Sequence, residues 1–257
     1  MKLDSILVVR RLTILLVGGE EMETMIIEVW GDLACFTRPE TKVERFSYPV
    51  MTPSAARGVL DAIYSKPVEF GWRIKQIDVL NPIRYIALRR NEVKDKIGIH
   101  AVQKAIKGGE TPLVICDATK SMSGSDQVGR TQRQTMALKN VRYRIHANIC
   151  PRRGFEKRKT ALEEQAKRRI EGGKCYYQPF LGCREFVAYY EFANMKSQPI
   201  NETTDLGWMV YDTFNIDEVV IGEAKPFITL FNATLNKGVI EIPAWESDMV
   251  RKPPKER

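Results

Sequence analysis

The side chains that could do chemistry in this 257-residue sequence are few. Only two histidines occur, His100 and His146, and there is no Walker loop, GxGxxG, HExxH or GxSxG motif. Paired acids at metal-site spacing are also missing, so we expect neither a metal site nor a cofactor. A two-histidine nuclease would need the segment around His100 to lie beside the strand that carries His146. What remains is chemistry by tyrosine, lysine and arginine: proton transfer and stabilisation of charged phosphoryl oxygens.

Tyr64 stands at the end of a predicted helix, Thr52–Tyr64. Thr52 is a good N-cap, and Pro53 suits the first helical position, where a missing N–H costs nothing. Pro67 ends the helix, because the residue before a proline avoids the helical region. The pattern alone favours a packing role for the Tyr64 ring, with its hydroxyl left at the helix end. Apolar residues recur at helical spacing at Ala56, Val59, Leu60 and Ile63.

The charge distribution predicts an anionic partner. The chain has a net charge of +8, and residues 130–174 hold 14 lysines and arginines against four glutamates, a local net charge of +10. This asymmetry indicates a localised anion-binding surface, although a solvated helix face would explain Lys167–Arg169 alone. Nucleic acid is favoured over a membrane, because the basic helix predicted over Phe155–Glu171 has few large apolar residues.

An alternating strand is predicted over Thr135–Ile149. Such a strand buries one face and presents the other, here a row of cations. Tyr143 and His146 are interleaved with the arginines, so bases could stack while phosphates pair. The apolar set is Val141, Tyr143, Ile145 and Ala147, and the polar set is Arg142, Arg144, His146 and Asn148.

The element order predicts an α+β fold. We expect a ferredoxin-like (RRM/RAMP-type) domain over residues 25–205, with a flexible insertion at about 90–130 and a short strand at Pro112–Cys116. Its other strands are predicted at Met25–Trp30, Phe70–Leu80, Pro82–Arg89, Thr135–Ile149 and Phe186–Phe192. Residues 206–257 are predicted to form a small antiparallel sheet and a disordered tail, and residues 1–24 a disordered extension. The strands of that sheet are predicted at Gly207–Phe214, Phe227–Leu235 and Val239–Ile242, with a tight turn at Asn236–Gly238.

Two motifs, SYPVMTPSAARGVLDAIYSKP (Ser47–Pro67) and YYQPFLGCREF (Tyr176–Phe186), carry a family resemblance. Together they resemble the Dvulg-type RAMP proteins of type I-C CRISPR systems, and the resemblance runs from about Met25 to about Ile242. It implies an endoribonuclease that cuts precursor CRISPR RNA within each repeat and stays bound to the product in Cascade. The implied partners are CRISPR repeat RNA and other Cascade subunits. DNA is a further candidate partner, and no membrane is expected.

Metal-free cleavage of RNA is compatible with the available residues. The ribose 2′-OH can attack the adjacent phosphate and leave a 2′,3′-cyclic phosphate and a 5′-OH. The protein need only orient this hydroxyl, stabilise the phosphoryl oxygens and protonate the leaving oxygen. General acid–base groups contribute on the order of 10²–10⁴-fold each. Tyrosine and lysine suffice for this without a metal.

The resemblance places the catalytic tyrosine at Tyr64. The family's second pair is a Lys-His ahead of the second helix, and here Lys159 is the nearest match, with Thr160 in place of the histidine. Lys157 remains an alternative to Lys159, and either lysine could simply grip phosphate. The general acid could be His146, or the lysine could do both jobs. If no residue replaces the histidine, the chain is instead a non-catalytic RNA-binding subunit of Cascade.

Ten residues are candidates for RNA binding. Most are cations that could pair with phosphate. Gly182 could let the backbone approach RNA closely, although a structural turn is an equal explanation for it. The candidates are Arg38, Lys139, Arg142, Arg144, Arg152, Arg153, Lys157, Arg158, Gly182 and Arg184.

The cysteines and the hydrophobic runs indicate the cellular compartment of the protein. There are five cysteines, an odd number without a CxxC pair, which favours reduced thiols over zinc or a disulfide framework. The apolar run Leu12–Val17 follows Arg10–Arg11, but no small-residue cleavage site comes after it. We therefore expect a cytoplasmic protein.

Overall fold

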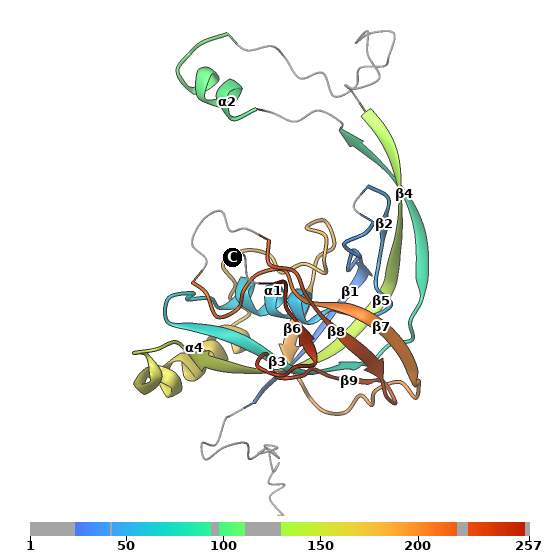
Figure 1. Ribbon diagram of the computed structural model, residues 1–257, viewed down its shortest axis with the longest axis vertical. Coiled ribbons are helices and arrows are strands. Elements are labelled where there is room, and N and C mark those ends of the chain that lie inside the picture. The colour runs from blue at the N-terminus through green and yellow to red at the C-terminus, as the bar shows by residue number, and fades with distance from the viewer. Residues whose placement is uncertain (1–23, 42, 94–97, 111–129, 220–225, 255–257) are drawn as a thin grey trace, which may run out of the picture.

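A seven-stranded sheet organises the chain in this computed structural model, which describes residues 24–41, 43–93, 98–110, 130–219 and 226–254. Five strands follow the order β6-β1-β5-β3-β9, and β2 and β4 also pair with β5 (Figure 1). The strands are β1 (Met25–Ala34), β2 (Arg45–Phe46), β3 (Phe70–Val79), β4 (Tyr85–Val93), β5 (Arg130–Pro151), β6 (Tyr189–Phe192) and β9 (Val239–Glu241). The predicted extension over residues 1–24 lies almost entirely outside the described residues.

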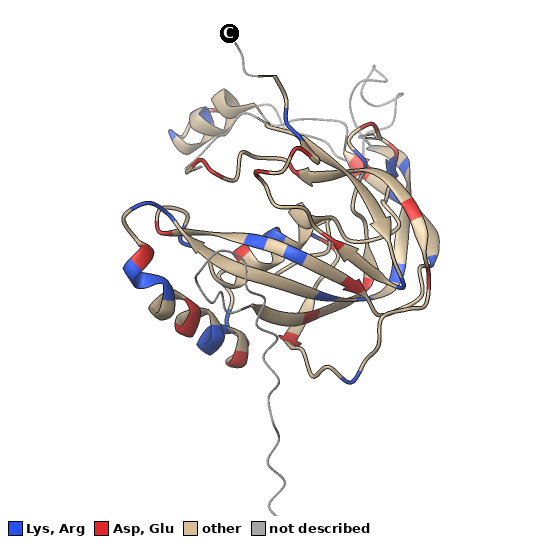
Figure 2. Ribbon diagram, turned by 60° about the horizontal axis from the view of Figure 1, so that its bottom comes forward, with Lys and Arg blue, Asp and Glu red and all other residues tan. Residues whose placement is uncertain are grey.

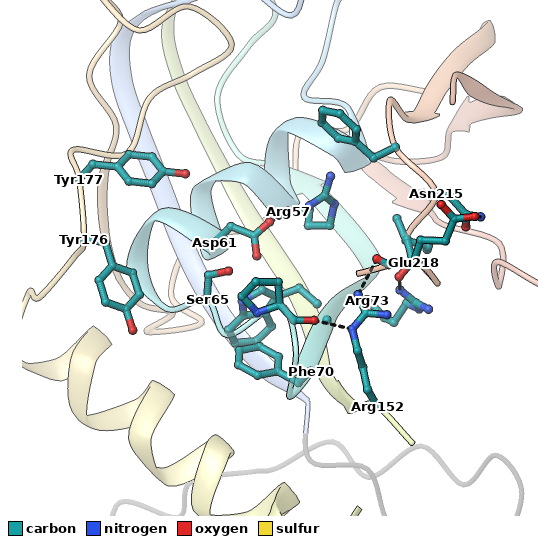
Figure 3. A pocket seen from close by; sticks show the side chains of 15 residues that line it. Arg57, Asp61, Ser65, Phe70, Arg73, Arg152, Tyr176, Tyr177, Asn215 and Glu218 are labelled. Carbon is teal, nitrogen blue, oxygen red and sulfur yellow. Dashed lines mark hydrogen bonds and ion pairs between the residues drawn. The ribbon is translucent and has the colours of Figure 1, made fainter. Parts of the chain in front are cut away.

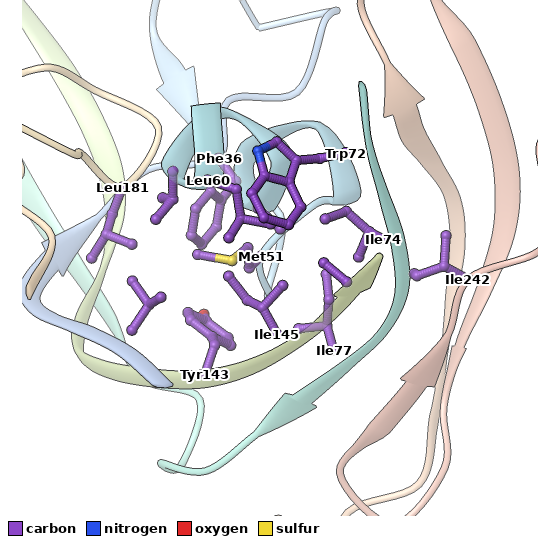
Figure 4. Close-up of a cluster of buried hydrophobic side chains, with 14 of the residues drawn as sticks. Phe36, Met51, Leu60, Trp72, Ile74, Ile77, Tyr143, Ile145, Leu181 and Ile242 are labelled. Carbon is purple, nitrogen blue, oxygen red and sulfur yellow. The ribbon is translucent and has the colours of Figure 1, made fainter. Parts of the chain in front are cut away.

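β5 is the central strand. It pairs antiparallel with β1, β3 and β4 along different parts of its 22 residues, and parallel with β2. The predicted alternation is confirmed on its apolar side, where Tyr143 and Ile145 are 2% and 0% exposed. Figure 4 shows these two side chains packed beneath α1 (Pro53–Ile63), beside Met51 and Leu60.

The predicted helix is confirmed as α1, together with its N-cap. The Thr52 side chain accepts a hydrogen bond from the Ala55 backbone N–H at 3.2 Å. Tyr64 is the C-cap, and its own N–H donates to the Leu60 carbonyl at 2.8 Å. Beside α1 lies α4 (Lys159–Glu171), preceded by the 3₁₀ turn η1 (Glu156–Arg158). The buried residues of both helices belong to one core on one face of the sheet.

The segment after β3 differs from the prediction. The strand expected at Pro82–Arg89 is β4, and it pairs only with the first part of β5, so that the two strands extend from the body as an arm. The predicted insertion also contains a helix, α2 (Ile99–Ile106), which Figure 1 shows apart from this arm. The short strand expected at Pro112–Cys116 lies outside the described residues.

The C-terminal sheet is also composed differently. It consists of β7 (Thr204–Asp212), β8 (Thr229–Leu235) and β10 (Val250–Arg251), in the order β10-β8-β7. β9, expected as its third strand, pairs instead with β3 and therefore joins the large sheet. The predicted turn before β9 is present, with Lys237 and Gly238 both at positive φ. Within the described part of the chain, no helix is both long and apolar enough to cross a membrane.

Candidate active site

Tyr64 lies where the end of α1 meets β3. Its side chain is only 2% exposed, and its ring packs on Phe70 at 5.2 Å between centroids. Its carbonyl accepts a hydrogen bond from the Trp72 indole N–H at 2.8 Å. Burial raises the pKa of the Tyr64 phenol, while the nearby cations Lys66 and Arg158 act in the opposite direction. At neutral pH the phenol is therefore protonated and can donate a hydrogen bond.

A small charged cluster adjoins this tyrosine. The Glu69 carboxylate pairs with Lys66 at 2.9 Å and with Arg158 at 2.8 Å. Arg158 ends η1, so the cluster joins the turn after α1 to the segment that precedes α4. Sequence reasoning missed Lys66 and Glu69, because only the fold brings the second helical segment to them.

The two lysine alternatives on this segment have different surroundings. Lys159 is the first residue of α4, is half-buried, and acts electrostatically on Cys150. Lys157 is exposed. On this segment it is Arg158 whose charge acts on the Tyr64 phenol. Figure 2 shows that acidic residues are interspersed with the basic residues of α4, so the helix is not a uniformly positive surface.

His146 lies on the other face of the sheet. Its neighbour Ile145 points into the core beneath α1, and successive strand residues point to opposite faces. The His146 ring is instead 3.1 Å from a carboxylate oxygen of Asp78 on β3. The expectation that His146 replaces the missing general acid beside Tyr64 does not fit this placement, because the sheet separates them.

The predicted cationic row on β5 is not an open surface. Arg144 is 3% exposed and donates to Glu28 at 2.9 Å and to Asp78 at 3.3 Å. Arg142 also pairs with Glu28, at 2.6 Å, and with Glu191 at 3.0 Å. These arginines are thus neutralised by acids from neighbouring strands, and the sequence pattern does not reveal those partners. Arg144 is thus buried and does not face solvent, whereas Arg142 keeps 26% of its side chain exposed, and RNA binding by Arg142 stays a prediction.

A cavity of about 660 Å³ opens beside the end of α1 (Figure 3). Ser65, the residue after Tyr64, lines it, together with Asp61 and Arg57 of α1. Figure 3 shows Tyr176 and Tyr177 on its opposite rim, and Phe214 and Asn215 also line it. Arg57 is held by Asp212 through bonds of 2.7 and 2.9 Å and by Asp61 at 2.7 Å.

A second cavity of about 510 Å³ shares the wall formed by Gly71, Arg73 and Arg152. The Arg152 guanidinium donates to three carbonyls, those of Pro67, Asp217 and Glu218, at 2.6 to 2.9 Å. Arg152 therefore builds the wall between the cavities, whereas Arg153 lines the second cavity and is exposed.

The second sequence motif contributes in two ways. Tyr176 is anchored by its N–H to the Ala62 carbonyl at 2.8 Å, and Arg169 of α4 lies over its ring at 4.2 Å. Gly182 has φ +83°, and a Cβ there would lie 2.0 Å from the Cys35 carbonyl oxygen. The structural reason for this glycine is therefore its contact with the chain after β1. Arg184 is exposed.

Two other RNA-binding candidates do not line either cavity. Arg38 stacks over the Tyr48 ring at 4.7 Å, and Lys139 lies on β5 opposite Leu33. The charged cluster around Tyr64 lines neither of these cavities itself, but Ser65 and Pro67, its neighbours in the chain, line the first. We call Tyr64, Lys66, Glu69, Arg158 and Lys159 the tyrosine site.

Comparison with known proteins identifies the family of this chain. A family model described as CRISPR-associated protein (Cas_Cas5) matches residues 24–243. A relative from Mannheimia succiniciproducens, named CRISPR pre-crRNA endoribonuclease Cas5d, is 38% identical and aligns over 88% of this chain and 97% of its own. A protein of the same name from Thermus thermophilus is 35% identical, over 87% of this chain and 93% of its own.

Solved structures show the same fold at lower identity. One, described as a CRISPR-associated protein, is similar with a TM-score of 0.58 at 20% identity, covering 90% of this chain and 97% of that chain. A functionally uncharacterized protein from Streptococcus mutans gives a TM-score of 0.56 with the same identity and coverage.

Proposed function

The chain belongs to the Cas5 family of CRISPR-associated proteins, and we propose that it is a metal-independent endoribonuclease that cleaves precursor CRISPR RNA within the repeat. Both relatives are named CRISPR pre-crRNA endoribonuclease, and the alignments cover nearly their whole length. The product remains bound, and the protein serves as a subunit of Cascade. The single observation that carries the chemistry is the buried, protonated Tyr64 beside Lys66, Glu69 and Arg158.

The roles follow from the protonation states. A neutral phenol cannot accept the proton of the 2′-OH, but it can donate one to the leaving 5′-oxygen. Glu69 is the carboxylate of the site that could take the 2′-OH proton. Lys66, Arg158 and Lys159 stabilise the charge that develops on the phosphoryl oxygens. The reaction leaves a 2′,3′-cyclic phosphate and a 5′-OH.

The RNA would follow the cavity beside α1. Tyr176 and Tyr177 are each about half exposed, at 54% and 52%, and offer ring faces on which unpaired bases can stack. Arg153 and Arg184 are exposed cations that can bind phosphate. This arrangement suits a single-stranded segment next to the scissile phosphate.

The fold supports an RNA-binding role. We infer a ferredoxin-like core from the strand order β6-β1-β5-β3 with α1 and α4 on one face. In this assignment, α1 connects β1 to β3 and α4 connects β5 to β6, as in a split βαβ unit. The loop after β7 then supplies part of the cavity wall through Phe214 and Asn215.

The test is to incubate the purified chain with repeat RNA in excess EDTA and to analyse the ends of any product. One cut that leaves a 5′-OH and a cyclic phosphate supports the proposal. Cleavage only after Mg²⁺ is added back would overturn metal independence.

A non-catalytic RNA-binding subunit is the second candidate. Thr160 stands where the family has a histidine, and His146 lies across the sheet. Tight, salt-dependent binding of the repeat with no product in any buffer would establish this alternative.

A further inference from the structure

Two buried cysteines meet where the chain after β1 contacts the second motif. Cys35 and Cys183 are 0% and 4% exposed. The Cys35 backbone N–H donates to the Leu181 carbonyl at 3.0 Å, and the Cys183 sulfur lies 4.0 Å from the Cys35 carbonyl oxygen. The close approach at Gly182 fixes this contact, because no side chain fits between the two backbones there. The fold therefore buries the sulfur atoms of Cys35 and Cys183 next to each other, although the two residues are far apart in the sequence.

One of these sulfurs has a cationic partner. An Arg45 guanidinium nitrogen lies 2.9 Å from the Cys183 sulfur. A thiolate accepts such a hydrogen bond far better than a neutral thiol does. The hydrogen bond from the Cys35 thiol, the hydrogen bond and charge of Arg45, and the charge of Arg90 outweigh burial and lower the pKa of Cys183 to about 6. The pKa of Cys35 is raised, because its ionisation would place two anions side by side in a buried site.

The other described cysteines differ. Cys150 and Cys175 are both more exposed than the pair. Burial raises the pKa of Cys150, and the charges of Arg73, Lys75 and Lys159 do not outweigh it. The thiolate is the form of cysteine that reacts with oxidants. We therefore expect Cys183, although buried, to be oxidised before the more exposed Cys150 and Cys175.

We propose that Cys35 and Cys183 form an oxidisable thiol pair. A hydroperoxide oxidises the Cys183 thiolate to a sulfenic acid, and the hydroperoxide is reduced to hydroxide or alkoxide. The Cys35 thiol then attacks the sulfenic sulfur, loses its proton, and displaces water to form a disulfide. The disulfide links the residue after β1 to the residue after Gly182, and a thiol reductant reverses it. This site is independent of the proposed cleavage chemistry.

The experiment follows disulfide formation in the full chain treated with hydrogen peroxide. Cys116, which lies outside the described residues, is replaced by serine in every protein compared. Non-reducing peptide mapping by mass spectrometry identifies the cross-link and measures its rate between pH 5 and pH 9. We expect a Cys35–Cys183 disulfide to form before Cys150 or Cys175 is oxidised, with the rate half-maximal near pH 6. The melting temperature should rise on oxidation and return on reduction.

Arg45 supplies the matched control. Arg45→Gln should slow the cross-link at pH 7 about tenfold and move the half-maximal rate toward the ordinary thiol range near pH 8.5. Arg45→Lys keeps the charge and should retain most of the rate. Circular dichroism confirms that each variant is folded. Oxidation of Cys150 or Cys175 without the cross-link, or an Arg45→Gln rate equal to that of the parent, would overturn the proposal.

Discussion

Arg57 on α1 holds Asp212 at the end of β7 through two hydrogen bonds of 2.7 and 2.9 Å. This pair fixes the C-terminal sheet against the helix that ends in Tyr64. Asp212 is almost fully buried, with 3% of its side chain exposed. The position of one cavity wall relative to the tyrosine site therefore depends on this contact.

Asp212→Ala should destabilise the protein by about 3 kcal/mol, because it leaves a partly buried guanidinium with only Asp61 as its partner. The more exposed pair of Arg38 and Glu40, 3.8 Å apart, is the control. Glu40→Ala should cost less than about 1 kcal/mol. Urea unfolding measures the free energy of unfolding of both variants. Equal decreases for Asp212→Ala and Glu40→Ala would show that the Arg57 contact contributes no more than a surface ion pair.

Tyr64→Phe should lower the rate of repeat cleavage by about 10²–10⁴-fold and leave RNA affinity nearly unchanged, because only the proton donor is lost. Single-turnover cleavage and filter binding separate the two effects. Tyr177→Phe, which keeps an aromatic ring on the cavity rim, should cleave at nearly the parental rate. If Tyr64→Phe weakened binding and cleavage together, Tyr64 would be a packing residue.

Arg158→Ala should slow cleavage by about 10²-fold, since it removes a cation next to Tyr64 and leaves Glu69 with Lys66 alone. Lys157→Ala removes an exposed positive charge from the adjacent position and should change the rate only slightly. The comparison is made at saturating RNA, so that differences in affinity do not contribute. Equal rates for the two variants would place Arg158 outside the chemistry.

Gly182→Ala should be strongly destabilising, because the new Cβ would lie 2.0 Å from the Cys35 carbonyl oxygen in a backbone of φ +83°. Gly154 provides a matched control, with φ +91° and no atom within 4 Å of the position that an added Cβ would take. Gly154→Ala should cost only the backbone strain, about 1–2 kcal/mol. Thermal melts measure the melting temperature of both variants. If Gly182→Ala lowered it no more than Gly154→Ala, the chain after β1 would be able to move away from the added Cβ.

Asp78 should make stability depend on pH in the acidic range. Burial opposes ionisation of its carboxyl, but hydrogen bonds from His146 and Gln76 outweigh this and lower its pKa below the usual 3.8. The stabilisation is therefore present above about pH 4 and is lost as the pH falls through the folded-state pKa. Asp78→Asn should be less stable than the parent at pH 7, and the gap should narrow below pH 4. Urea unfolding at each pH measures this gap, and Asp32→Asn, at an exposed position, should cost less than about 0.5 kcal/mol at pH 7.

The sequence by itself determined the local elements. Thr52, Pro53 and the apolar spacing after them specified α1 with its N-cap, because capping and amphipathic periodicity act within a few residues. The alternation on β5 likewise specified which side chains enter the core. The two motifs indicated the family, which the comparison with known proteins confirmed.

Only the tertiary structure decided which polar side chains meet. The sequence pattern predicts that Arg144 is free to bind RNA, but Glu28 and Asp78 neutralise it from strands more than sixty residues away in the chain. The pattern also permits His146 to lie beside Tyr64. Side chains alternate between the two faces along β5, however, and the His146 ring lies on the opposite face from Tyr64. The pairing of Arg158 with Glu69 and the contact between Arg45 and Cys183 could not be predicted from the sequence for the same reason. Long-range pairings depend on strand order and register, which local spacing does not encode.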